Sequence, residues 1–145
     1  MRCVTVKEPG GPEVLGIADL PEPVARSGQL LVRNFAAGLN RADLLQRRGL
    51  YPPPAGESDI LGLEFAGEVA AVGDGVEGFS RGDRVFGLCG GGAYADFLVV
   101  DECLALEIPP NMSYESAAAV PEAFYTAGDA LFSLGQLKEG QVVLV

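Results

Sequence analysis

The chain has 145 residues, of which 48% are hydrophobic, and it carries 20 glycines, 10 prolines and a formal net charge of -10. This length suits one domain with a real core or slightly more than one domain. The acidic charge argues against nucleic acid or an anionic membrane as a partner, and the many turn-forming residues favour a β-barrel or sandwich over a helix bundle.

Three cysteines, Cys3, Cys89 and Cys103, are scattered along the chain, and no two of them form a C-x-x-C pair. An odd number without such pairs is typical of a reducing cytoplasm rather than of a disulfide framework, so we expect all three to be buried apolar residues. The first residues, MRCVTVKEP, contain no apolar run long enough for a signal peptide or a membrane span. The sequence therefore predicts a cytoplasmic protein.

Apolar runs with strand periodicity, separated by turn signals, dominate the first three quarters of the chain. They predict β-strands at residues 3–6, 14–20, 29–38, 64–73, 85–88, 93–100 and 103–108. The turn Pro9-Gly10-Gly11-Pro12 should make an antiparallel hairpin of the first two strands. In the strand at 64–73, glycines and small alanines allow close backbone approach or a bulge, as barrel corners require.

Helical signals replace the strand signals after Pro109. Ser113 is placed to cap a short helix at 113–120, and Pro121 opens a longer helical pattern that Gly135 ends. The last five residues, QVVLV, form an apolar β-branched run that is typical of a strand buried in a parallel sheet. Because such a strand has no partner in this chain, we expect the sequence to stop where an α/β domain would begin.

Polar groups concentrate in the stretch 40–67. Asn40 is placed to cap a short helix, and Asp43, its third helical residue, completes a capping-box-like pair. Because aspartate caps helices equally well, Asn40→Asp should leave stability almost unchanged.

Gly49 should end this helix, so that Arg47 and Arg48 lie in its last turn as solvated charges beside the negative helix end. Tyr51 follows and leads into Pro52-Pro53-Pro54, which runs extended. A tyrosine is thus held on a stiff loop.

Four segments, taken together and in order, resemble one family: LNRADLLQRRGLYPPP, ILGLEFAGEVAAVGDGV, FSRGDRVFGL, and AAAVPEAFYTA with KEGQVVLV. They resemble the N-terminal, GroES-like catalytic domain of the medium-chain dehydrogenase/reductase superfamily, particularly its zinc-free quinone oxidoreductases of the zeta-crystallin type. The resemblance implies a mainly β fold with short helices, a GroES-like partly open β-barrel at 1–120. Residues 121–145 would then be a connecting helix and the first strand of a truncated nucleotide-binding (Rossmann) domain.

The same comparison indicates that metal ligands are missing. Zinc-dependent members carry a cysteine where Asn40 stands and a histidine where Leu63 stands, and this chain contains no histidine. We therefore expect no metal site of the usual N/S type. The hydroxyl residue that relays protons in alcohol dehydrogenases is replaced by Ala42, so alcohol oxidation is not expected.

For the site residues, the resemblance implies that Asn40 and Tyr51 line the catalytic cleft near the nicotinamide. It places Thr126 against the cofactor, Arg41 toward the cofactor pyrophosphate, which a guanidinium can pair with, and Asp43 behind them.

Simpler roles remain open for these residues. Asn40 and Asp43 could only cap the helix, Tyr51 could only pack in its loop, and Thr126 could bond back to a carbonyl. Glu64 is expected to be a partly buried acid without a catalytic role.

The implied activity is hydride transfer from NADPH to a quinone or enone, with the main cofactor site in the missing domain. The intact protein is expected to be a homodimer acting on a small molecule, without nucleic-acid or membrane partners. Two alternatives stay open. One is an enoyl-reductase domain of the same superfamily, and the other is a stand-alone, non-catalytic GroES-like binding domain, because the sequence lacks a G-x-G-x-x-G motif.

Overall fold

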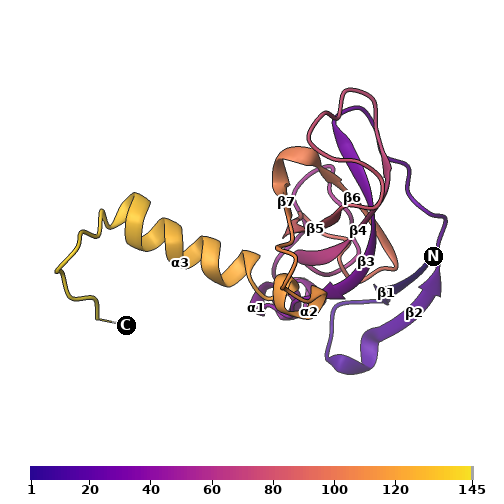
Figure 1. Cartoon of the computed structure of the whole chain (residues 1–145). Coiled ribbons are helices and arrows are strands. Elements are labelled where there is room, and N and C mark those ends of the chain that lie inside the picture. The colour runs from indigo at the N-terminus through magenta and orange to yellow at the C-terminus, as the bar shows by residue number, and fades with distance from the viewer. Residues whose placement is uncertain (145) are drawn as a thin grey trace.

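The computed structural model describes residues 1–144, and within that range the strands form two sheets (Figure 1). The smaller sheet is an antiparallel hairpin of β1 (Arg2–Val6) and β2 (Leu15–Asp19), joined through a short 3-10 turn, η1 (Pro12–Val14). The hairpin predicted from the Pro-Gly-Gly-Pro turn is confirmed.

The larger sheet is antiparallel throughout and has the strand order β6-β3-β4-β5-β7. Its strands are β3 (Gln29–Ala37), β4 (Glu64–Val72), β5 (Arg84–Leu88), β6 (Phe97–Asp101) and β7 (Ala105–Glu107). A 3-10 turn, η2 (Glu102–Leu104), joins the two edge strands β6 and β7. The sheet curls around its own core as a partly open barrel (Figure 1), so the predicted mainly β fold is confirmed.

The barrel core consists of alternating side chains from several strands. Phe65, Leu30, Val32, Val69 and Val85 are all fully buried in it. Burying one such side chain contributes about 2 kcal/mol, so this cluster supplies much of the stability of the barrel.

A second apolar cluster lies between the sheet and α2 (Tyr114–Ala118), where Ala117 and Ala118 pack against Ala66, Phe86 and Ile108. The alanines let the helix approach the strands closely. The predicted cap is confirmed, because the backbone N–H of Ser116 donates to Ser113 Oγ at 3.2 Å.

β3 and β4 pass unusually close to each other. A Cβ atom built on Gly67 would overlap the carbonyl oxygen of Arg33, and the pairing of the two strands shifts register between Asn34 and Ala36. The predicted role of the β4 glycine in close backbone approach is confirmed.

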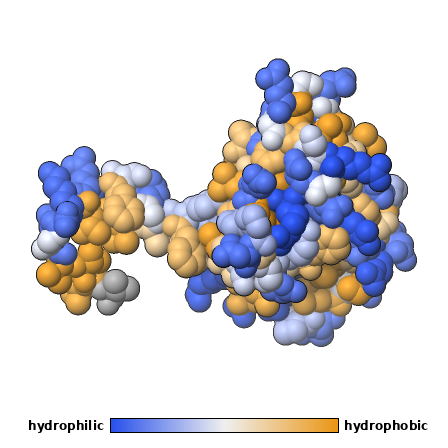
Figure 2. Space-filling model, in the orientation of Figure 1, coloured by the Kyte–Doolittle hydropathy of each residue, from blue (hydrophilic) through white to orange (hydrophobic). Residues whose placement is uncertain are grey.

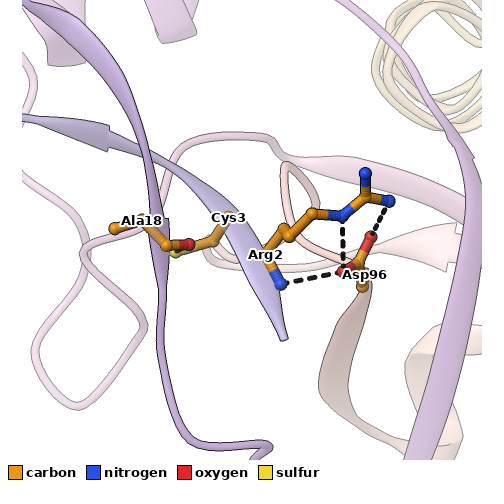
Figure 3. Close-up of polar contacts among 4 residues, drawn as sticks. All are labelled: Arg2, Cys3, Ala18 and Asp96. Atoms are coloured by element: carbon orange, nitrogen blue, oxygen red, sulfur yellow. Dashed lines mark hydrogen bonds and ion pairs between the residues drawn. The ribbon is translucent and has the colours of Figure 1, made fainter.

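The N-terminal hairpin is fastened to the barrel beside β6 (Figure 3). The backbone N–H of Arg2 donates to Asp96 Oδ2 at 2.8 Å, and its guanidinium donates to both oxygens of the same carboxylate at 3.0 and 3.2 Å. This hydrogen-bonded guanidinium lowers the pKa of the Asp96 carboxyl. Both side chains are exposed, so the pair orients the hairpin more than it stabilises the fold.

The cysteines divide into two kinds. Cys3 and Cys89 are buried, but Cys103 is exposed in η2, so the prediction that all three are buried is wrong for Cys103. The tight turn between the edge strands directs its side chain to solvent rather than into the barrel. Burial raises the pKa of the Cys89 thiol to about 12.

We therefore expect a thiol reagent at neutral pH to modify one cysteine, Cys103, in the folded chain and all three after unfolding. Absorbance titration with a disulfide reagent, before and after adding guanidinium chloride, measures both numbers. Cys103→Ser is the control and should react only after unfolding. Two rapidly reacting thiols in the folded wild type would contradict the burial of Cys3 and Cys89.

Three helical segments, η3 (Pro121–Tyr125), α3 (Thr126–Gly128) and η4 (Asp129–Leu134), run on as one helix that projects away from the barrel (Figure 1). The predicted helix from Pro121 to Gly135 is confirmed. Pro121 is fully buried, whereas Phe124, Phe132 and Leu134 are exposed. Figure 2 shows this apolar surface at the far end of the helix and on the tail beyond it.

Residues 141–144 form no strand, and Val142 and Leu144 are 96% and 99% exposed. A strand is stabilised by pairing, and no neighbouring strand lies beside these residues within residues 1–144, as expected for a strand without a partner in this chain. That these residues begin a nucleotide-binding domain stays a prediction. Val145, the last residue of that prediction, lies outside the described residues. No helix in residues 1–144 has the length and apolarity needed to cross a membrane.

Candidate active site

The polar helix start at Asn40 lies directly beyond the end of β3, which delivers it through Gly38 and Leu39. Asn40 is the N-cap of α1 (Arg41–Arg47) and has a capping-box arrangement with Asp43, as predicted. The firm bond of this box runs from the Asn40 backbone N–H to Asp43 Oδ2, at 2.7 Å. The Asn40 side chain makes no cap bond of ordinary geometry and is directed elsewhere.

Its partner is Glu64, the first residue of β4. Asn40 Nδ2 donates to Glu64 Oε1 at 2.8 Å, and the backbone N–H of Glu122 donates to Glu64 Oε2 at 3.0 Å. Glu64 is only 4% exposed. Burying a carboxylate is costly unless hydrogen bonds compensate it, and here each oxygen has one donor.

A second buried carboxylate supports the same helix start. Asp43 is 4% exposed, and its Oδ2 also accepts the Tyr94 hydroxyl at 2.8 Å, a hydroxyl that lies 3.1 Å from the carbonyl of Gly38 as well. Burial, and after it the hydrogen bond to Asp43, raises the pKa of the Tyr94 hydroxyl. Tyr94 therefore stays protonated and holds Asp43 and the end of β3 together.

The structure thus brings Asn40 and Asp43 together and adds Glu64 and Tyr94, whose partnership sequence reasoning missed. A signal for Glu64 existed, since it follows Leu63 at the position where zinc-dependent relatives carry their histidine and glutamate. The sequence showed no signal for Tyr94, because its contact with Asp43 joins residues 51 positions apart.

The other predicted site residues lie on the surface. Arg41 and Thr126 are exposed and Tyr51 is 44% exposed, and no side chain of the three makes a hydrogen bond within residues 1–144. The structure therefore does not join them to the Asn40–Glu64 pair. The bond from Thr126 back to a carbonyl, considered above, is also not formed in the described part of the chain.

The prediction that Arg47 is a solvated charge is wrong. This residue is buried rather than solvated, and its Nε donates to the carbonyl of Gly10 at 3.1 Å, while the Gly10 N–H donates to the Arg47 carbonyl at 3.2 Å. The loop after β1 covers the helix end, which the sequence of the helix alone could not indicate. Arg48 is exposed, as predicted.

Metal ligands do not gather at this site. Across residues 1–144, no three His, Cys, Asp or Glu side chains come together in a way that could hold a metal ion.

A curled antiparallel sheet that presents a capped polar helix directly after β3 is the arrangement of a GroES-like domain. A family model described as the alcohol dehydrogenase GroES-like domain matches residues 26–110, and the chain belongs to this family. The resemblance found in the sequence is confirmed.

Several curated relatives align with the whole chain, and two of them show the range of names. The mouse (Mus musculus) synaptic vesicle membrane protein VAT-1 homolog-like is 37% identical over 145 residues, and the rat (Rattus norvegicus) quinone oxidoreductase is 35% identical over 147. All of this chain is covered, against 35% and 45% of the two relatives. The chain therefore spans less than half the length of the curated relatives it matches.

Solved structures of the same two kinds of protein resemble the fold of this chain. The human synaptic vesicle membrane protein VAT-1 homolog-like protein superimposes with a TM-score of 0.90 at 36% identity, covering 97% of this chain and 45% of that one. The quinone oxidoreductase of Escherichia coli, solved in complex with NADPH, gives 0.83 at 34% identity, covering 90% and 40%.

Proposed function

We propose that this chain is the N-terminal part of a zinc-free, NADPH-dependent oxidoreductase that transfers hydride to a quinone or a similar activated acceptor. The observation that carries the proposal is the Asn40–Glu64 pair. It places a neutral amide, fixed by a buried carboxylate, at the helix start where zinc-dependent relatives have a metal ligand. Likeness to quinone oxidoreductases over the whole chain supports the substrate class.

NADPH, when bound, would supply the hydride, and the residues of this chain would bind and orient. Arg41, exposed in the first turn of α1, suits a phosphate, because its guanidinium can pair with two oxygens and the helix start adds positive potential. Thr126 would face the cofactor from the connecting helix, and Asp43 would hold Asn40 from behind.

The acceptor would lie between Asn40 and Tyr51. Of the two N–H groups on Asn40 Nδ2, one is bonded to Glu64, and the other remains to meet an oxygen that gains negative charge. Tyr51, partly exposed on its proline-stiffened loop, would form a wall of the substrate cleft.

Further proposals concern the organisation of the whole protein. Residues 1–120 would form the substrate domain, and residues 121–145 would connect to a nucleotide-binding domain, against which the exposed apolar helix surface would pack. The intact enzyme would be a cytoplasmic homodimer acting on a small molecule.

Expression of the longer reading frame that contains codons 1–145 tests the function. We expect that enzyme to oxidise NADPH with 1,4-benzoquinone much faster than with an enoyl thioester, and to keep its rate after chelator treatment. The 145-residue chain alone should show no turnover and no micromolar affinity for NADPH, which would require about 8 kcal/mol of binding.

Three results would contradict the proposal. Preference for the enoyl thioester would assign an enoyl reductase, loss of activity with the chelator would assign a metal enzyme, and a stop codon after residue 145 would leave a stand-alone domain.

A further inference from the structure

The carboxylate of Glu64 joins two parts of the chain that are far apart in sequence. Its Oε1 accepts from the side chain of Asn40, 24 residues away, and its Oε2 accepts from the backbone of Glu122, 58 residues away. One partner begins α1 and the other lies in the first turn of the connecting helix. A single buried side chain therefore touches the proposed site and the segment that leaves the barrel.

The structure leaves a place for this carboxylate at Gly38. A Cβ atom on Gly38 would overlap the Glu64 carboxyl group, so the side chain occupies space that only glycine leaves open. Since the backbone φ of Gly38 is not in the left-handed region, steric room rather than conformation is what this glycine provides.

The second carboxylate oxygen of Glu64, Oε2, accepts a hydrogen bond from the start of the connecting helix. Glu122 N–H is one of the first donors of the helix, which have no partner within the helix itself, and a carboxylate is favoured there by the helix dipole. Pro121 is buried, but residues 123–127 are all exposed, so few other groups fix the direction of the helix.

We propose that Glu64 is a positioning residue that sets the orientation of the Asn40 amide and the direction of the connecting helix together. A carboxylate only accepts hydrogen bonds, so the amide nitrogen of Asn40, and not its oxygen, must face it. Movement of the connecting helix that draws the Glu122 N–H away would then shift the Glu64 carboxylate and change the orientation of the Asn40 amide. This inference rests on the proposed function only in taking Asn40 as a site residue.

Two variants remove the connection in different ways. Glu64→Gln keeps the shape but has one acceptor for two donors, so one bond must break or the Asn40 amide must turn over. Gly38→Ala keeps the charge but displaces the carboxyl group. Glu68→Gln, further along the same face of β4, is the matched control.

Nuclear magnetic resonance of the 145-residue chain measures the connection without any activity. For both test variants we expect shifted Asn40 side-chain amide signals and about tenfold faster hydrogen exchange of the Glu122 N–H, with neither change in Glu68→Gln. Unchanged Asn40 signals and unchanged Glu122 exchange in both test variants would overturn the proposal.

A second measurement tests the direction of the connecting helix. Cys103 is exposed, so spin labels on Cys103 and on a Ser133→Cys substitution report the distance from barrel to helix. We expect a broader distance distribution when Glu64→Gln is added, and an unchanged distribution would overturn the helix part of the proposal.

Activity of the longer enzyme separates this inference from the proposed function. We expect Glu64→Gln to lower kcat about tenfold with a smaller effect on KM, because orientation rather than substrate affinity is lost. An unmodified enzyme without quinone turnover would refute the proposed function alone. Changed amide signals with unchanged kcat would overturn the positioning role.

Discussion

Gly67→Ala is expected to destabilise the barrel by about 3 kcal/mol, the upper part of the range for overpacking a rigid interior. Its Cβ would overlap the carbonyl oxygen of Arg33 and would also lie 2.8 Å from Val32 Cγ1. The first obstacle is backbone in the adjacent central strand, which cannot turn aside as a side chain does. Relief would require β3 and β4 to separate and to lose hydrogen bonds of the ladder.

Chemical denaturation measures this effect as a lower midpoint with an unchanged slope. Gly128→Ala is the matched control, since Gly128 has helical dihedral angles and no atom within 4 Å of the added methyl. Alanine there should leave the midpoint unchanged or raise the stability, by up to about 1 kcal/mol. Equal midpoints for Gly67→Ala and the wild type would show that the strands are not held so closely.

The strands and helix starts could be predicted because their signals are local. Alternation marks residues such as Leu30 and Val32 as one face of a strand, and Ser113 and Asn40 precede helices with the residue types that cap them. The glycine of β4 carried a further signal, because glycine within a strand indicates close approach. The fold class followed from these patterns together with the family resemblance.

The predictions that were wrong or incomplete concern contacts between residues that are far apart in the sequence. Arg47 is buried by a loop 37 residues earlier, and the Glu64 carboxylate finds donors 24 and 58 residues away. Local patterns therefore located the Asn40 helix start, but they could not show what its side chain faces.

Because the Asn40 side chain faces Glu64, the structure changes the stability that we expect of the Asn40→Asp variant. The sequence predicted an almost unchanged stability, because aspartate also caps helices. In the structure the substituted group lies 2.8 Å from Glu64 Oε1, so aspartate would set a half-buried carboxylate against the buried carboxylate of Glu64. We now expect a loss of about 3 kcal/mol at pH 7, as for a buried charge left without its partner.

The pH dependence of that loss has a definite sign. Repulsion raises the pKa of one carboxyl in the folded variant above its value in the unfolded chain. Above the raised pKa both groups are charged and the loss is complete, whereas below it one proton bridges the pair and the loss shrinks. Thermal or chemical unfolding of variant and wild type between pH 4 and pH 8 should show the two curves converging toward acid. A constant difference across this range would contradict the carboxylate pair.

The double variant Asn40→Asp with Glu64→Gln separates stability from function. In this double variant the hydrogen bond between positions 40 and 64 runs in the opposite direction, because the amide nitrogen introduced at position 64 can donate to the carboxylate at position 40. The carbonyl oxygen of the same introduced side chain can accept from the Glu122 N–H. Every group again has a partner, so we expect most of the lost stability to return, as a coupling energy in a double-mutant cycle of the four proteins. Turnover of the longer enzyme should stay about a hundredfold low, because residue 40 no longer donates to the oxygen that gains charge. Recovery of both stability and turnover would show that residue 40 only fastens the helix start, and recovery of neither would show that Glu64 is not its partner.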